Sequence, residues 1–253
     1  MRWRLLFIAG LFFSMIAGSV SPSYAGTAAP NTGKQMSLAE LKKKFPEFLI
    51  LNGPGDEKKV ALTFDDAPDA VYTRPILQVL REHNVEATFF LVGYRAEEMP
   101  DIVVEIDRAQ HAIGNHSYNH PHFPEVSMAE FIRQVERTQQ ILHNLIGYRP
   151  RLFRPPYGAV TESQLTWAVE HDFTVVNWNV DSLDWKSLKA EEVSQNILDN
   201  VGPGSIILQH AGGGIGEDLS GTVWALPKII RSLKEQGYTF VTVPELLGIP
   251  RYQ

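Results

Sequence analysis

The sequence predicts an α/β protein whose main domain is a distorted (β/α) barrel of about seven parallel strands. From Lys59 almost to the C-terminus, short apolar runs alternate with stretches of helical periodicity. The runs are continuously apolar, as at residues 205–208, which indicates strands buried on both faces and therefore a parallel sheet. Polar residues gather where these runs end. An open doubly wound sheet is the alternative architecture.

Each expected strand is followed by an expected helix, which is the repeat that a parallel barrel requires. The apolar runs lie at residues 60–66, 87–92, 112–117, 152–156, 174–181, 205–210 and 239–243. The segments with helical periodicity lie around residues 74–83, 101–109, 127–145, 162–171, 190–200 and 223–236. Several of these segments begin with Ser, Thr or Asp residues, which cap helix N-termini.

The first 25 residues have the pattern of an export signal. Arg2 and Arg4 precede an apolar run at residues 5–16, and residues 23–25 have the small-x-small pattern of a cleavage site. An uncleaved membrane anchor is the alternative, although the run falls short of the roughly 20 residues that span a bilayer. In either case we expect a secreted or envelope-associated, extracytoplasmic protein.

Residues 26–58 are expected to form a linker with a short helical extension, ahead of the domain at residues 59–253. Residues 26–34 are polar and rich in Gly, Pro and Thr, as linkers are. Residues 37–50 predict one amphipathic helix, with Ser37 as its N-cap and Glu40 three residues later.

The composition excludes several kinds of partner and chemistry. A net charge of −6 gives no attraction to nucleic acid, which needs clustered Lys and Arg. The chain has 0 cysteines, so disulfides, thiolate nucleophiles and Cys-based zinc sites are absent. Any metal must therefore bind to His and carboxylate side chains. We expect a monomer that could contact a membrane only through an uncleaved N-terminal segment.

Chemically active residues lie at the ends of several predicted strands, where parallel α/β folds collect their active sites. They are Asp65 and Asp66, Asn115 and His116, Arg154, Asp181, and Gln209 and His210. An even scatter would also place polar residues at the opposite strand ends and on helix faces. The sequence therefore predicts an active site at one mouth of the barrel.

Asp66, His116 and His120 are the expected metal ligands. A His-x3-His pair presents two imidazoles on one face of a helical turn, and one carboxylate completes three protein ligands with a position left open for catalysis. Zinc is the default divalent ion for this set, and cobalt or another transition metal would also suit it. The adjacent carboxylates of Asp65 and Asp66 would repel each other unless a cation lies near them. With Asp66 bound to that cation, Asp65 is free to accept a proton from water.

His210 is the expected general acid. Hydrolysis of an amide requires protonation of the leaving amine, and an imidazole stays protonated when a carboxylate binds its second nitrogen. Either Asp181 or Asp184 could supply that carboxylate. The histidines outside these groups, at positions 83, 111, 143 and 171, are expected to be solvated.

The chain resembles the polysaccharide deacetylase family, whose NodB-homology domains are also called carbohydrate esterase family 4. The resemblance covers roughly residues 59–247 and rests on ordered motifs, which makes it more specific than any one of them. The motifs are TFDDAP at 63–68, HSYNHP at 116–121, RPPYG at 154–158, DSLDW at 181–185 and LQH at 208–210.

The resemblance implies a role for each motif residue. Asp65 would be the general base, oriented by Arg154, and His210 would be the general acid, oriented by Asp184. Asp66, His116 and His120 would hold the metal. Tyr157, Trp185, Leu208 and Asp181 would contact the substrate: the Tyr157 backbone N–H would stabilise the oxyanion, and Trp185 and Leu208 would enclose the acetyl methyl.

The first motif has Ala67 where the family usually has Gly. If that position needs a positive φ, an alanine adds strain on the order of 1 kcal/mol.

The resemblance implies a metal-dependent hydrolase that removes N-acetyl groups from an amino-sugar polymer, either peptidoglycan or a chitin-like oligosaccharide. An O-acetyl polysaccharide esterase of the acetylxylan type would use the same groups. A non-catalytic sugar-binding relative is the alternative from another class, although the complete set of motifs argues against a decayed site.

Overall fold

The computed structural model describes residues 36–214 and 216–253. The export signal expected at residues 1–25 and the linker expected at residues 26–34 lie outside the described residues. None of the helices within the described ranges is long and apolar enough to cross a bilayer.

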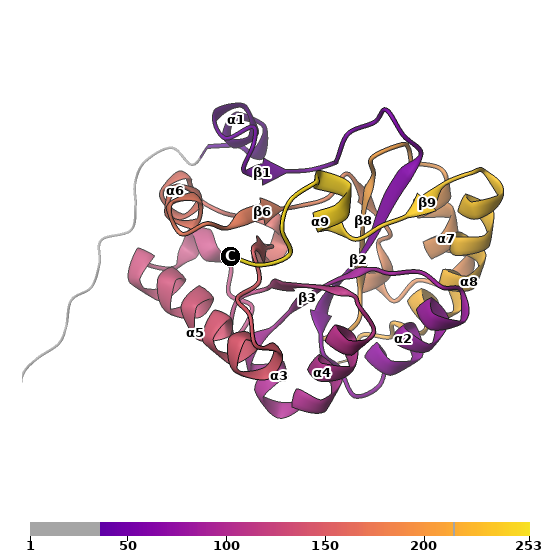
Figure 1. Cartoon of the computed structure of the whole chain (residues 1–253), viewed down its shortest axis with the longest axis horizontal. Coiled ribbons are helices and arrows are strands. Elements are labelled where there is room, and N and C mark those ends of the chain that lie inside the picture. The colour runs from indigo at the N-terminus through magenta and orange to yellow at the C-terminus, as the bar shows by residue number, and fades with distance from the viewer. Residues whose placement is uncertain (1–35, 215) are drawn as a thin grey trace, which may run out of the picture. The chain divides into compact units, whose positions relative to one another are not determined.

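A single parallel sheet organises the domain and curls into a half-barrel surrounded by helices (Figure 1). Its strands are β1 (Leu49–Ile50), β2 (Lys59–Ala67), β3 (Thr88–Leu91), β4 (Ala112–Asn115), β5 (Leu152–Phe153), β6 (Thr174–Val176), β7 (Val180–Asp181), β8 (Ile206–His210) and β9 (Thr239–Phe240). The order is β1-β6-β5-β4-β3-β2-β8-β7, and β9 pairs with β2. The predicted distorted barrel of parallel strands is confirmed.

The expected helices form close to the expected positions because their apolar periodicity is local. They are α2 (Thr73–Glu82), α4 (Pro100–Arg108), α5 (Met128–Ile146), α6 (Glu162–Glu170), α7 (Ala190–Leu198) and α8 (Ser220–Glu235). Two short helices, α3 (Gly93–Glu98) and α9 (Val243–Leu247), were not expected. Single 3-10 turns form at η1 (Phe123–Glu125), η2 (Pro156–Gly158) and η3 (Asp184–Lys186).

The long central strand β2 separates the apolar core from the inside of the curl. Val60, Leu62 and Phe64 are fully buried in the largest core cluster, which includes apolar residues of α2, α4, α7 and α8. The intervening Thr63 and Asp65 face the other way and bond to Arg154. The alternation of side chains along the strand thus places Val60, Leu62 and Phe64 against the helices. Thr63 and Asp65 lie on the other face, together with Ala61, which belongs to a separate apolar cluster.

The run at residues 174–181 forms two strands instead of one. β6 pairs with β1 and β5, whereas β7 pairs with β8 at the other edge of the sheet. Between them, the Asn179 side chain accepts a hydrogen bond from the Ile206 N–H at 2.9 Å. The run crosses the opening where a closed barrel would be sealed, which a pattern of apolar residues cannot reveal.

The helix expected at residues 37–50 is wrong in its second half. Helix α1 (Leu38–Lys44) has the predicted capping box of Ser37 and Glu40, but it ends before Pro46. The residue before a proline is disfavoured in helical conformation, so Phe45 ends the helix. Leu49 and Ile50 then pair with β6, and the folded unit therefore includes residues that precede Lys59.

Candidate active site

The carboxyl ends of the strands surround a cavity of about 480 Å³, a size typical of small-molecule sites. All the predicted site residues line this cavity except Arg154 and Asp184, which lie buried behind it. The other lining residues are Val92, Tyr94, Arg95, Asn119, Trp178, Gly214 and Glu217. Asn115 and Gln209, also noted at strand ends, are buried and do not line it.

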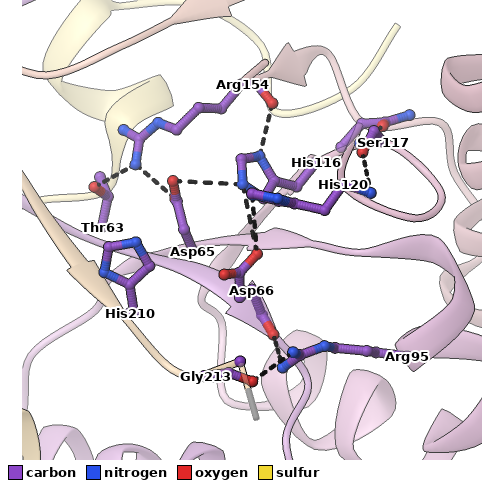
Figure 2. Close-up of polar contacts among 12 residues, drawn as sticks. Thr63, Asp65, Asp66, Arg95, His116, Ser117, His120, Arg154, His210 and Gly213 are labelled. Atoms are coloured by element: carbon purple, nitrogen blue, oxygen red, sulfur yellow. Dashed lines mark hydrogen bonds and ion pairs between the residues drawn. The ribbon is translucent and has the colours of Figure 1, made fainter. Parts of the chain in front are cut away.

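Asp66, His116 and His120 come together as a group that could hold a metal ion, with one potential ligand atom each within 4.8 Å of the others. Asp66 Oδ1 lies 3.7 Å from His116 Nε2 and 3.5 Å from His120 Nε2 (Figure 2). His116 Nδ1 lies 2.7 Å from the Arg154 carbonyl oxygen. A carbonyl only accepts hydrogen bonds, so Nδ1 carries the proton and the Nε2 lone pair is available for a metal.

The environment keeps the His116 imidazole in its neutral, ligating form. Burial, followed by the neighbouring charge of His120, lowers the pKa of His116 to about 3. The ring is therefore unprotonated at neutral pH, as metal ligation requires.

His116 and His120 are not on a helical turn, so that part of the prediction is wrong. Ser117 and His120 have φ values of 66° and 59°, in the left-handed region, and the segment is a loop. Helix α5 holds this loop from behind: Gln134 Oε1 accepts the backbone N–H groups of Tyr118 and Asn119, at 3.0 and 2.9 Å. The His116 and His120 rings nevertheless meet, with centroids 5.0 Å apart.

Asp65 is held by Arg154, a fully buried side chain that follows β5. Arg154 Nη1 donates to Asp65 Oδ1 at 2.7 Å and to Thr63 Oγ1 at 2.8 Å. Its Nε and Nη2 atoms donate to the carbonyl oxygens of Val176 and Asn177. Burial raises the pKa of Asp65 and the guanidinium of Arg154 opposes that rise, so the arginine favours the ionised carboxylate.

His210 is paired with Asp184, which resolves the choice between Asp181 and Asp184. His210 Nδ1 lies 2.8 Å from Asp184 Oδ1, while Asp184 Oδ2 accepts the His210 backbone N–H and the Thr222 hydroxyl. Burial alone would lower the pKa of His210, but the charge and hydrogen bond of Asp184 raise it to about 9. Asp181 lines the cavity, and its carboxylate accepts the Leu183 N–H.

The register between β2 and β8 sets the relation of these two groups. Asp65 and His210 are paired positions in the ladder, so a charged imidazole and a buried carboxylate occupy neighbouring strands at the same height. Hydrolysis of an amide needs one group to remove a proton and another to deliver one. A carboxyl group and an imidazole therefore lie side by side, where these two tasks could be divided between them.

Aromatic and apolar residues form the mouth of the cavity. Trp185 and Tyr157 are partly exposed, whereas Leu208 is buried. Tyr157 has a φ of 59° within η2. Among the described residues, none accepts a hydrogen bond from the Tyr157 backbone N–H. A free N–H at the mouth can bind a developing oxyanion.

Several supporting residues were missed by the sequence analysis. Gln134 and Thr222 are polar side chains on the buried faces of helices, and that position was the available signal. Arg95 had no signal in the sequence. His111 is buried, not solvated: its Nδ1 accepts the Ala87 N–H, and burial lowers its pKa to about 4.

The expected strain at Ala67 is wrong. Ala67 is fully buried at the end of β2 and pairs with Leu91, and its φ is not positive. The left-handed residue is its neighbour Asp66, at 62°. An alanine is therefore compatible with the first motif.

The fold and the site define a hydrolytic enzyme built on a parallel half-barrel. The sequence profile described as polysaccharide deacetylase matches residues 52–176. A peptidoglycan-N-acetylglucosamine deacetylase of Bacillus cereus is 48% identical over 195 residues, which cover 77% of this chain and 70% of that protein. The chain belongs to the polysaccharide deacetylase family, as the sequence motifs implied.

Solved structures agree with this assignment. The Bc1960 peptidoglycan N-acetylglucosamine deacetylase matches with a TM-score of 0.80 and 46% identity, over 81% of this chain and 95% of that chain. A carbohydrate esterase family 4 pseudoenzyme from Bacillus anthracis matches with a TM-score of 0.73 and 32% identity, over 78% of this chain and 68% of that chain. The solved relatives therefore include a pseudoenzyme as well as a deacetylase.

Proposed function

We propose that this protein removes N-acetyl groups from an amino-sugar polymer, with the N-acetylglucosamine of peptidoglycan as the first candidate substrate. The observation that carries the proposal is the His210–Asp184 pair, which keeps an imidazole protonated opposite the buried Asp65 carboxylate. An amide needs such an acid because its leaving amine must be protonated. Similarity to peptidoglycan-N-acetylglucosamine deacetylases supports the choice of polymer.

We also propose that a divalent cation binds to Asp66, His116 and His120, with zinc the ion best suited to the set. Two imidazole nitrogens and one carboxylate are typical zinc ligands, and the neutral His116 directs Nε2 to the Asp66 side. When bound, the cation would supply Lewis-acid polarisation of the amide carbonyl and lower the pKa of water.

The side chains of this chain would then divide the reaction between them. Asp65, oriented by Arg154, would take one proton from the attacking water. The Tyr157 N–H would stabilise the negative charge on the former carbonyl oxygen. His210 would give its proton to the amine nitrogen as the carbon–nitrogen bond breaks, which yields the free amine and acetic acid. The acid ionises to acetate in water, and proton exchange with solvent would return Asp65 and His210 to their starting states. Trp185 and Leu208 would enclose the acetyl methyl.

We propose that the protein acts outside the cytoplasm, at the cell wall. The export-signal pattern at residues 1–25 and the names of the peptidoglycan-directed relatives support this location. The proposal thus includes zinc as the bound ion and export from the cytoplasm. It places peptidoglycan N-acetylglucosamine ahead of N-acetylmuramic acid and chitin oligomers as the substrate.

The test is mass spectrometry of acetate loss from chitin oligomers and from peptidoglycan fragments, measured side by side. The purified protein is assayed as prepared, after treatment with a chelator, and after zinc is restored. We expect turnover of at least one substrate, its loss on chelation and its recovery with zinc. An Asp65→Asn variant that folds and binds zinc serves as the inactive control.

Acetylated xylan is assayed beside the other two substrates, and three outcomes would contradict the proposal. Turnover that resists the chelator would show that the reaction does not depend on a metal. Absence of turnover on every acetylated substrate, with zinc bound, would favour the non-catalytic sugar-binding alternative. Turnover of acetylated xylan alone would favour the O-acetyl esterase.

A further inference from the structure

Arg95 lies in α3 and lines the cavity, with only 13% of its side chain exposed. Its Nη1 atom donates to the Asp66 carbonyl oxygen at 2.9 Å, and its Nη2 atom donates to the Gly213 carbonyl oxygen at 2.8 Å (Figure 2). Its Nε atom donates to the Tyr94 hydroxyl at 3.0 Å. One planar guanidinium thus connects the segment after β2 with the segment after β8.

The Asp66 carbonyl accepts its hydrogen bond from a side chain, whereas the carbonyls on either side of it accept backbone N–H groups. The carbonyl on one side of it, at Asp65, accepts the Ala211 N–H at 2.8 Å, and the carbonyl on the other side, at Ala67, accepts the Val92 N–H at 2.9 Å. The register of β2 against β3 shifts around Asp66, whose φ is 62°. The sheet therefore holds the residues on both sides of Asp66, and the arginine side chain holds the Asp66 carbonyl.

The segment after His210 passes directly over this contact. A Cβ at Gly212 would lie 2.1 Å from Arg95 Nη1 and 2.3 Å from the Asp66 carbonyl oxygen. Position 212 therefore accommodates only glycine while the guanidinium occupies its place. The close approach brings the Gly213 carbonyl, three residues beyond His210, within reach of the same arginine.

We propose that Arg95 is a positioning residue for the metal centre, which fixes the backbone of Asp66 and thereby aims its carboxylate at the two histidines. The role follows from two hydrogen bonds donated by separate nitrogens of one rigid, planar guanidinium, a fixed geometry that the single nitrogen of a lysine ammonium does not reproduce. It rests on the proposed function in one respect, the assignment of Asp66 as a metal ligand. Arg95 acts on the ligand through the backbone and touches no ligand atom of the group.

The experiment compares zinc affinity in Arg95→Met, Arg95→Lys and the matched control Arg74→Met. Arg74 is also an arginine that joins two segments, but its ion pairs with Asp101 and Glu105 lie on exposed helices outside the cavity. The zinc dissociation constant is measured by competition with a chromophoric chelator, together with thermal unfolding of the metal-free protein and kcat and KM at saturating zinc.

Arg95→Met is expected to weaken zinc binding roughly 10- to 100-fold, the usual effect of losing a group that orients a ligand. Arg95→Lys keeps the charge but donates from a single nitrogen, so its affinity for zinc should fall between those of the wild type and Arg95→Met. Arg74→Met should bind zinc as the wild type does. Saturating zinc should restore more of kcat in Arg95→Met than dilute zinc does.

An unchanged dissociation constant in Arg95→Met overturns the proposal, even if the variant unfolds at a lower temperature, because a purely structural role would affect stability alone. Should Arg95→Met fail to fold, Arg95→Lys decides by the same criterion. A wild-type protein that binds no zinc overturns the proposed metal site itself, which is a separate and distinguishable result.

Discussion

His210 and Asp65 are paired across neighbouring strands, and different partners set their protonation states. Asp184 stabilises the imidazolium of His210, whereas Arg154 stabilises the carboxylate of Asp65 against the effect of burial. For His210, the charge of Asp184 outweighs the effect of desolvation on the pKa. For Asp65, the charge of Arg154 opposes that effect. Separate charged partners of this kind allow one pocket to hold both an acid and a base.

Replacement of His210 should affect amides and esters differently. An amine is a poor leaving group unless it is protonated, so His210→Ala should lower kcat/KM on an N-acetylglucosamine oligomer by roughly 10²- to 10⁴-fold. An aryl acetate, whose phenolate leaves without a proton, should lose much less. Parallel assays on the two substrates check this, with the exposed His143→Ala as a control; equal losses on both would argue against the acid role.

The raised pKa of His210 predicts the high-pH limb of activity. The acid must be protonated to react, so kcat/KM on an amide should fall as the pH rises through the pKa of His210, which Asp184 holds above its ordinary value. A pH–rate profile of the zinc-loaded enzyme measures this limb. If the limb stays in place when Asp184 is changed to Asn, Asp184 does not set the charge of His210.

The same pair predicts how stability varies with pH. The pKa of His210 is raised in the folded state from 6.5 to about 9, so its contribution is complete below pH 6.5 and is lost as the pH rises through 9. The free energy of unfolding of the metal-free protein should decrease across this window by about 3 kcal/mol at most. Urea unfolding at several pH values, compared with His210→Gln, should show a flatter dependence in the variant.

At the scale of elements, the loop between β4 and η1 depends on a helix that follows it in sequence. Gln134 and Gln139 of α5 are both buried, and they bond to the loop and to Asn115. The loop contains two residues with positive φ, so its conformation is not one that the chain adopts readily alone. Helix α5 therefore helps to bring His116 and His120 to the same point.

Gln134→Leu should release this loop. The variant leaves the backbone N–H groups of Tyr118 and Asn119 without their acceptor, which costs about 1–3 kcal/mol for each group that stays buried. Zinc affinity should fall roughly 10-fold or more because the histidines lose their support. Chelator competition and thermal unfolding measure both effects, and Gln140→Leu, on the exposed face of the same helix, is the control. Unchanged zinc affinity in Gln134→Leu would show that the loop keeps its conformation without the support of Gln134.

Element boundaries show where local pattern is sufficient. The amphipathic helices α2, α4 and α5 lie within a few residues of their expected positions, because helical periodicity is a property of the segment itself. The run at residues 174–181 divides between two edges of the sheet, and its division depends on where the half-barrel opens. That opening is a property of all the strands together.

At the scale of the whole molecule, the proposed metal ligands connect distant parts of the chain. Asp66 belongs to β2, and His116 and His120 belong to the loop that follows β4. A bound ion would therefore link two segments of the folded protein that are independent in the unfolded chain, and it would stabilise the folded state by mass action.

Zinc should accordingly raise the unfolding temperature, and a chelator should lower it. At a free zinc concentration 100 times the dissociation constant, the stabilisation is about 2.7 kcal/mol. For a domain of this size, each kcal/mol shifts the transition by roughly 2–4 °C. Scanning calorimetry with and without zinc measures the shift, and His116→Asn should show little of it. A wild-type unfolding temperature that changes with neither zinc nor the chelator would contradict the proposed metal site.

The sequence by itself determined the class of the fold, the strand-end position of the reactive groups and the family. Those features depend on residue type, periodicity and motif order, all of which are local to short segments. Only the tertiary structure decided that His116 and His120 lie on a loop supported by Gln134, that the run at residues 174–181 divides between two edges of the sheet, and that Arg95 bonds to the Asp66 carbonyl. These contacts join residues from different elements, and their distances are set by packing through space, which no short stretch of sequence contains.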